Sequence, residues 1–412
     1  MKRILLIPFL LLMISSVLLA QESIETNEEA LFGTAEGQDA VAGSDEESLF
    51  GDGELISEVE EKQENLSTVL LTSENLEIGG RYRFDASSAW SFNGATGPFG
   101  ADLIDDPLTL DLGALVFLDA RPSETFRVYG EVDVAYPFSD QGGTREFDEV
   151  FHVSELFSDF QFGDAVFFRA GKQTINWGVG YFFSPADLLN VTEIDPEDPE
   201  AELEGPVAIK IQAPIGAHNL YLYTVFEDAA SIDEVALAPK AEFVIGDTEI
   251  GLGAFYRAGD APAAMTTLTT SLLDFSIFVE GIVSYDERFF PSATAGFSYR
   301  FSDDLDLFNI SVSSQYLYNG EGTDSELHYG AASASWSGMF GSDFNLGCFW
   351  LGNLSDGSGM IAPSLSWNLI EDLDLTLKAS YRYGGVGDEY TPTPAGDTMT
   401  LSVSAGFGGG SF

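Results

Sequence analysis

Residues 372–383 of this 412-residue chain read DLDLTLKASYRY. Leucine, alanine and tyrosine take every second position from Leu373 to Tyr383, and the positions between them hold aspartate, threonine, lysine, serine and arginine. Successive side chains of a β-strand point to opposite faces of its sheet. This stretch therefore predicts a strand with one apolar face and one polar face.

The same two-residue period recurs in most of the chain from about residue 76 onward. About eighteen such segments can be marked before residue 407, without a 3.6-residue period in any of them and without an apolar run of eighteen residues after the first twenty. These absences exclude helical membrane spans and indicate an all-β protein. Clear examples are residues 76–86, 108–118, 126–136 and 275–285.

The composition removes several functional classes. With 67 acidic and 17 basic side chains, the chain has a formal charge of −50, which repels a polyanionic backbone and argues against nucleic-acid binding. Apolar residues make up 45% and aromatic residues 13%, too many for a disordered acidic polymer. The single cysteine, Cys348, rules out an intrachain disulfide framework and a multi-cysteine metal site.

Residues 1–20 have the layout of a cleaved secretory signal peptide. Lys2 and Arg3 precede an uncharged apolar run that ends at Leu19, and Ala20 then meets the polar Gln21. An uncleaved membrane anchor is the alternative, but the run is short for a span and contains a proline. We expect the mature chain to lie outside the cytoplasm.

Residues 21–75 form a second region, predicted to be an acidic and mostly disordered periplasmic tail. Its first 46 residues hold fifteen acidic side chains and one lysine, a composition that cannot bury enough apolar surface to fold. A unit with the pattern EE[AS]LFG occurs twice, eighteen residues apart. Either the unit is a docking motif for a periplasmic protein, or acidic low-complexity sequence was duplicated without a function. The anchors of such a motif are Leu31, Phe32, Leu49 and Phe50.

Residues 76–412 are predicted to form the folded part, and three features favour a transmembrane barrel over soluble sandwiches or a solenoid. Several segments reach nine residues, which a tilted strand needs to cross a bilayer. Aromatic residues gather toward segment ends, for example Tyr381 with Tyr383, as interfacial girdles require. Short turns such as residues 246–247 alternate with long connections such as residues 184–205.

Residues 169–190 read RAGKQTINWGVGYFFSPADLLN. This stretch resembles the R-x-G-[RK]-Q-x-I-x-W-G … P-x-D-L-x-N signature of Gram-negative-type outer-membrane β-barrels, including alginate-export-like porins. The resemblance implies a strand that runs into a long loop approaching the lumen, and it implies pore-side positions for Arg169, Gln173, Trp177 and Asp187. The terminal Phe412 is out of phase with the last apolar face, so either Phe412 or Phe407 would close the strand that the barrel-assembly machinery reads.

An acidic cluster follows this stretch directly. Seven carboxylates fall within residues 193–204, and they include Glu193, Asp195, Glu197 and Asp198. Either the cluster is a solvated external loop, or it folds toward the pore and favours cations, with Ca²⁺ or Mg²⁺ loosely held. An EF-hand cage is not indicated, because the central glycine is missing. The bases expected on the opposite wall are Arg81, Arg83, Arg127, Arg169 and Lys172.

Catalysis receives little support. The three histidines, His152, His218 and His328, lie in separate segments without metal-ligand spacing, and no nucleophile elbow or nucleotide-binding loop is present. A hydrolase with a site assembled from distant strands is still a formal alternative.

The sequence thus predicts an antiparallel β-barrel of about sixteen to eighteen strands in the lipid of a cell outer membrane, without an enzymatic activity, a resident metal or a cofactor. Its predicted function is passive diffusion of small solutes with a preference for cations. The alternative function is a plugged barrel that serves as a surface anchor or adhesin, with the tail docked to a periplasmic partner.

Overall fold

The computed structural model describes residues 71–73, 75–94, 103–137, 150–163, 165–227, 229, 231–302, 308–370, 373–392 and 396–411. Strands account for most of these residues, with two single-turn 3₁₀ helices, η4 (Ile232–Glu234) and η5 (Met339–Gly341). No helix in the described part of the chain is long and apolar enough to cross a membrane. The predicted signal peptide (residues 1–20) and the docking residues Leu31, Phe32, Leu49 and Phe50 lie outside the described residues.

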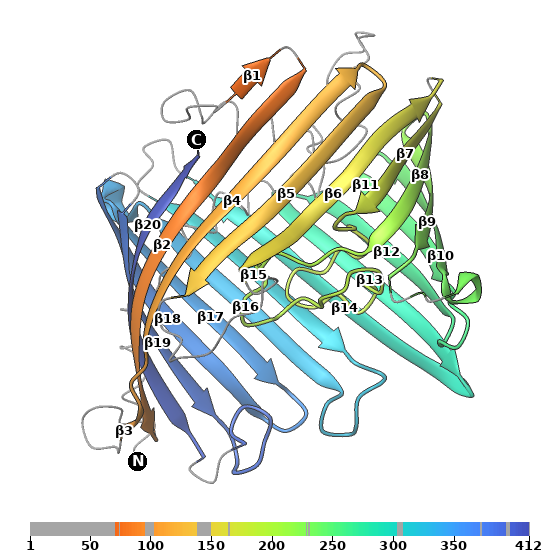
Figure 1. The fold of residues 1–412 in the computed structure, drawn as a ribbon. Coiled ribbons are helices and arrows are strands. Elements are labelled where there is room, and N and C mark those ends of the chain that lie inside the picture. The colour runs from red at the N-terminus through yellow and green to blue at the C-terminus, as the bar shows by residue number, and fades with distance from the viewer. Residues whose placement is uncertain are drawn as a thin grey trace.

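The strands form one antiparallel barrel (Figure 1). Eighteen long strands make up its wall in the described residues, and the three-residue β1 (Leu71–Ser73) and β3 (Leu103–Asp105) pair with the two ends of β2. The wall strands are β2 (Leu76–Asn93), β4 (Leu108–Ser123), β5 (Phe126–Pro137), β6 (Phe151–Phe162), β7 (Val166–Lys172), β8 (Val207–Ile215), β9 (His218–Val225), β10 (Ala236–Ile245), β11 (Thr248–Phe255), β12 (Ala263–Leu272), β13 (Phe275–Asp286), β14 (Arg288–Phe301), β15 (Asn309–Tyr318), β16 (His328–Ser337), β17 (Phe344–Asn353), β18 (Ser358–Ile370), β19 (Leu373–Tyr383) and β20 (Thr398–Ser411).

Closure occurs at β2, which pairs with β4 on one side and with β20 on the other. Its register places Ser87 opposite Ser404 of β20 and opposite Thr109 of β4. A closed barrel has no sheet edge with unpaired backbone groups. A β-sheet protein in a membrane requires such closure, because lipid cannot hydrogen-bond those groups. The all-β antiparallel barrel predicted from the sequence is confirmed, at the upper end of the predicted strand number.

The two ends of the barrel differ, as the sequence predicted. The short turn at residues 246–247 lies at the end where β2 begins and β20 ends. The long connections, including residues 173–206, lie at the opposite end, where the turn between β13 and β14 at Glu287 is a short exception. β20 continues past Phe407 as far as Ser411, with a shift in register against β2 between Arg83 and Arg81, and Phe412 lies outside the described residues.

Alternation along the strands separates an apolar outer face from an inner face that is mostly polar, with apolar side chains where β8 to β13 meet a loop inside the barrel. On β19, for example, Leu377 and Tyr381 point outward, whereas Lys378 and Arg382 point inward, where Arg382 contacts a loop inside the barrel. Aromatic rings pair on the outer face near strand ends, as in Phe275 with Tyr299 at 4.7 Å between centroids. The outer surface therefore combines apolar side chains, which suit the hydrocarbon core of a bilayer, with aromatic rings, which suit the membrane–water interfaces.

Candidate functional site: a loop across the barrel lumen

The long connection between β7 and β8, residues 173–206, folds into the barrel instead of outward from it (Figure 1). Its groups contact inward-facing side chains on strands around most of the circumference, from β2 through β10, β13 and β15 to β19. The loop has two parts that are held in different ways. We call residues 174–190 the anchor segment and residues 191–205 the acidic segment.

The anchor segment begins with an apolar contact to the wall. Ile175, Trp177, Ala186 and Leu189 are buried in one cluster with side chains from β8 through β13. The Trp177 ring is 1% exposed and meets the Tyr223 ring edge-on, with 5.3 Å between centroids. Such burial is the largest favourable contribution available to a loop without regular structure.

A single carboxylate on β13 fixes the middle of the anchor segment. Glu280 is fully buried, and its oxygens accept hydrogen bonds from the backbone N–H groups of Val179 (2.6 Å), Gly180 (3.1 Å) and Ala186 (2.7 Å) and from the Ser184 hydroxyl (3.1 Å). Backbone donors in a turn form an anion-binding concavity. Here the anion belongs to the protein itself, so the arrangement is a structural anchor.

Two glycines of the signature stretch make this approach possible. A Cβ added at Gly178 would lie 1.9 Å from the Ser184 Oγ and 2.6 Å from the Glu280 Oε2, and one at Gly180 would lie 1.8 Å from the Phe183 oxygen. Gly178 is therefore required by close packing around Glu280, and Gly180 by the close approach of the Phe183 carbonyl beside Gln315.

A glutamine on β15 holds the next turn. The Gln315 Oε1 accepts hydrogen bonds from the backbone N–H groups of Tyr181 (3.1 Å) and Phe182 (2.7 Å), while its Nε2 donates to the Phe183 oxygen (2.5 Å). Phe182 and Phe183 are also buried in a second apolar cluster, against side chains of β16 to β18. The anchor segment therefore packs against two separate parts of the wall.

The end of the anchor segment is cross-linked to its beginning. Asn190 donates to both carboxylate oxygens of Asp187 (3.1 and 2.9 Å) and to the Ile175 oxygen (2.8 Å), and its Oδ1 accepts from the Ile175 N–H (2.9 Å). Burial raises the pKa of Asp187 to about 6, although the hydrogen bonds from Asn190 act in the opposite direction.

Ion pairs hold the acidic segment. The Arg382 Nη2 on β19 lies 2.8 and 2.5 Å from the two oxygens of Glu197. The Lys172 Nζ lies 2.7 Å from Glu204, and the pKa of Glu204 is lowered by the hydrogen bond and the charge of this lysine. A weaker pair joins Arg81 to Glu202 at 3.6 Å. The carboxylates of Glu193, Asp195 and Asp198 are exposed.

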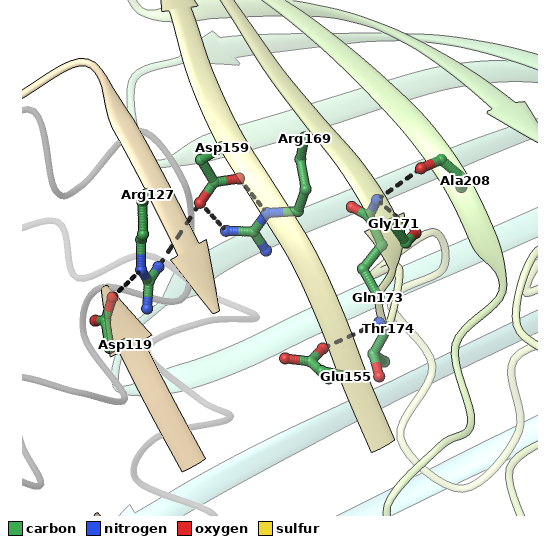
Figure 2. Close-up of polar contacts among 9 residues, drawn as sticks. All are labelled: Asp119, Arg127, Glu155, Asp159, Arg169, Gly171, Gln173, Thr174 and Ala208. Atoms are coloured by element: carbon green, nitrogen blue, oxygen red, sulfur yellow. Dashed lines mark hydrogen bonds and ion pairs between the residues drawn. The ribbon is translucent and has the colours of Figure 1, made fainter. Parts of the chain in front are cut away.

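The predicted basic residues alternate with acids on the wall behind the loop (Figure 2). Arg127 on β5 lies between Asp119 (3.0 Å) and Asp159 (3.7 Å), and Arg169 on β7 pairs with the same Asp159 at 2.7 Å. The Arg169 guanidinium also stacks over Phe157, 3.8 Å from its centroid. Arg83 on β2 pairs with Asp85 at 2.7 Å. These bases form ladders with carboxylates of the same wall.

The structure divides the predicted constriction residues into two groups. Arg169, Gln173 and Trp177 are buried where the loop meets the wall, and the Gln173 Nε2 donates to the Ala208 oxygen at 3.2 Å (Figure 2). Asp187 is enclosed within the anchor segment, whereas Glu197 and Asp198 line a cavity beside the loop. A direct role of these buried residues in solute passage stays a prediction.

In the described part of the chain, three carboxylates come close enough to share a metal ion. They belong to Glu131 and Asp133 on β5 and to Glu202 of the acidic segment. Their ligand atoms lie within 4.8 Å of one another, and Arg81 already pairs with Glu202. Loose binding of Ca²⁺ or Mg²⁺ to residues 193–204 stays a prediction. His152, His218 and His328 lie on β6, β9 and β16, in separate contacts.

Glu280 and Gln315 as anchors and Arg382 as the partner of Glu197 were not predicted from the sequence. Polar residues occur on the inner face of every such barrel, so the sequence does not indicate which of them a loop will contact. A second missed feature had a visible signal: serines repeat at alternate positions in residues 311–313, 333–337, 364–366 and 402–404. This pattern places a row of hydroxyl groups on the inner face of neighbouring strands.

Comparisons with known proteins give a likeness of fold only. No protein-family model matches the chain, and no curated protein is similar to it in sequence. Among solved structures, Acinetobacter baumannii OccAB4 has a TM-score of 0.50 at 8% identity, over 82% of this chain and 99% of that one. Acinetobacter baumannii OccAB1 (TM-score 0.47, 10% identity, 84% and 99% coverage) and a mutant of the Rh. blastica porin (TM-score 0.45, 9% identity, 81% and 99% coverage) are more distant in shape.

Proposed function

We propose that this protein is a porin-like channel of a bacterial outer membrane, through which small solutes diffuse passively. The observation that carries the proposal is the loop of residues 173–206, which crosses the lumen of a closed barrel and narrows it without regular structure of its own. The apolar outer face fits a lipid environment, and the polar inner face fits a water-filled passage. The likeness of fold to OccAB4 is consistent with this proposal.

We further propose that the passage prefers cations. Residues 173–206 hold eight acidic side chains and no basic one, and the exposed carboxylates of Glu193, Asp195 and Asp198 stand on the part of the loop that reaches into the lumen. Residues 67–412 contain 52 acidic and 14 basic residues, and their charges cannot face lipid. A lumen with this excess attracts cations and repels anions.

Reversal potentials in a KCl gradient across planar bilayers test both parts of the proposal. We expect stable channel currents with a reversal potential on the cation-selective side, and a shift toward zero in the variant Glu193→Gln/Asp195→Asn/Asp198→Asn. The matched control is Asp247→Asn/Asp274→Asn/Asp343→Asn, which removes three exposed carboxylates from turns at the other end of the barrel. Absence of current from folded protein contradicts the channel, and anion selectivity contradicts the cation preference.

The alternative function is a plugged barrel that anchors a partner. It predicts that folded protein gives no channel current in the planar-bilayer measurement. Two apolar clusters and a buried carboxylate hold the anchor segment inside the lumen, and this packing favours a plug as well as a constriction. Deletion of residues 21–66 separates the roles. Loss of a periplasmic partner with conductance unchanged supports a docking tail on a channel, whereas folded protein without current in both forms supports the anchor.

A further inference from the structure

The inner face of β14 to β16 carries a row of serine hydroxyl groups, and Arg300 of β14 stands in register with Ser311 at one end of it. Ser298 of β14 stands opposite Ser313 of β15, which stands opposite Ser333 of β16, and Ser311 stands opposite Ser335. The hydroxyl oxygens of Ser313 and Ser333 are 2.6 Å apart. This serine face contrasts with the wall from β4 to β7, where arginines alternate with aspartates.

A cavity of about 230 Å³ separates the serine face from the loop. The loop contributes Tyr181 and Phe182 from the anchor segment and Glu197, Asp198 and Glu200 from the acidic segment. The Tyr181 hydroxyl donates to Glu200 at 2.8 Å, which fixes that ring beside the opening. An apolar cavity of roughly 150 Å³ is known to hold benzene, so this space accommodates a six-membered ring with substituents.

We infer that the cavity is a binding subsite for a neutral polyhydroxylated solute, of the size of a sugar ring. The inference rests on the proposed channel function and names the class of solute that the channel passes. Each serine hydroxyl is both a donor and an acceptor, so a row of them can hydrogen-bond a polyol in many orientations as it moves. Carboxylates accept from sugar hydroxyls, and an aromatic ring offers a surface for the apolar face of the sugar.

Charge in the cavity argues against an anionic solute. Glu197, Asp198 and Glu200 stand on one side of it, and Lys378 of β19 is the base on its lining. Apolar side chains such as Phe182, Phe278 and Phe349 also line the cavity, and the serine hydroxyls among them favour a solute that replaces their hydrogen bonds to water over a purely apolar one. A solute with many hydroxyl groups replaces those bonds and adds no charge.

The test measures single-channel KCl currents in planar bilayers while D-glucose or D-glucuronate is added. We expect glucose to interrupt the current in a saturable way, and glucuronate to need at least about fivefold more for the same effect. In Ser311→Ala/Ser313→Ala/Ser333→Ala/Ser335→Ala the half-effective glucose concentration should rise at least about fivefold, a change of roughly 1 kcal/mol. Folding of each variant is checked by the heat-dependent shift in gel mobility.

The matched control is Ser87→Ala/Ser404→Ala, a pair of serines that face each other on β2 and β20 and do not line the cavity. Its glucose dependence should stay within twofold of the parent. A KCl current without any saturable glucose effect overturns the subsite but not the proposed channel. Stronger interruption of the current by glucuronate than by glucose has the same consequence. Folded protein without current overturns both proposals, and an equal loss in the control assigns the effect to the lumen as a whole and overturns the subsite.

Discussion

The two parts of the lumen loop are close in sequence but are held by different kinds of interaction. The anchor segment, residues 174–190, has buried rings and backbone groups that bond to Glu280 and Gln315. The acidic segment, residues 191–205, is tied to the wall by ion pairs such as Arg382 with Glu197, whose side chains are 37% and 35% exposed. Buried hydrogen bonds are costly to break, whereas exposed ion pairs contribute little and are screened by salt.

This contrast gives the loop a fixed part and an adjustable part. The anchor segment determines where the lumen is narrowed, because its position depends on buried contacts that salt does not screen. The acidic segment carries the exposed carboxylates on a weaker tether, so its position should respond to ionic strength. The following changes test that division in order of decreasing effect, with amide hydrogen exchange of residues 179–186 and 193–204 as the common readout.

The largest effect is expected for Glu280→Leu. The change leaves the buried N–H groups of Val179, Gly180 and Ala186 without their acceptor, at about 1–3 kcal/mol each. The free energy of local opening should fall by several kcal/mol, and exchange at residues 179–186 should accelerate at least about a hundredfold.

The matched control for Glu280→Leu is Glu249→Leu, because Glu249 faces inward on β11 in register with Thr269 and belongs to the same wall. It should leave exchange in residues 179–186 within a fewfold of the parent. If Glu280→Leu is equally silent, the carboxylate is not the anchor of this segment.

How much of this arrangement can be predicted from sequence depends on the range of the interactions. The barrel follows from a local signal, since alternation in stretches such as residues 373–383 records which side of each strand meets lipid. Residues 169–190 marked the strand that enters the loop, by resemblance. The contacts of the loop join residues about a hundred or more apart, as Val179 joins Glu280, and no local pattern encodes that pairing.

The next effect in size is expected for Gln315→Leu. This change removes one acceptor from the Tyr181 and Phe182 N–H groups and one donor from the Phe183 oxygen, a loss of roughly 2–4 kcal/mol. Exchange should accelerate at residues 181–183 more than at Ala186, which Glu280 still holds.

Gln212→Leu is the matched control for Gln315→Leu. Gln212 is another buried glutamine of the inner face, on β8, and its Nε2 donates to Asn219 on β9 at 3.3 Å. Acceleration at residues 181–183 in this control as large as in Gln315→Leu would show that the effect comes from the wall and not from the loop contact.

A smaller effect follows from the titration of Asp187. Its pKa is about 6 in the fold against 3.8 as the reference, because burial disfavours the charged form. The folded loop thus binds more protons than the opened loop between these values. Its stability is greatest below pH about 4 and declines as the pH rises through about 6, by roughly 2–3 kcal/mol for this difference in pKa.

Exchange of residues 186–190, corrected for the intrinsic pH dependence, measures this effect between pH 4.5 and 7.5. Opening should be more frequent at the higher pH, and Asp187→Asn should remove the difference while keeping an acceptor oxygen for the turn. A pH profile that is unchanged in Asp187→Asn would assign the titration to another group.

The smallest effect is expected for Arg382→Gln, which acts on the other side of the comparison. The ion pair with Glu197 is about one-third exposed on both sides, and such pairs contribute less than about 1 kcal/mol. Exchange at residues 193–204 should rise only a fewfold. In the parent protein 0.5 M NaCl should produce at least as large a rise, because it also screens the pairs of Lys172 with Glu204 and of Arg81 with Glu202, and in the variant its effect should be smaller. Residues 179–186 should not respond to either change.

Lys378→Gln is the control, since Lys378 faces the same lumen from the same strand and is not in the Glu197 pair. If salt and Arg382→Gln accelerated exchange equally in both segments, the loop would move as one body, and the distinction between a fixed constriction and an adjustable charged segment would fail.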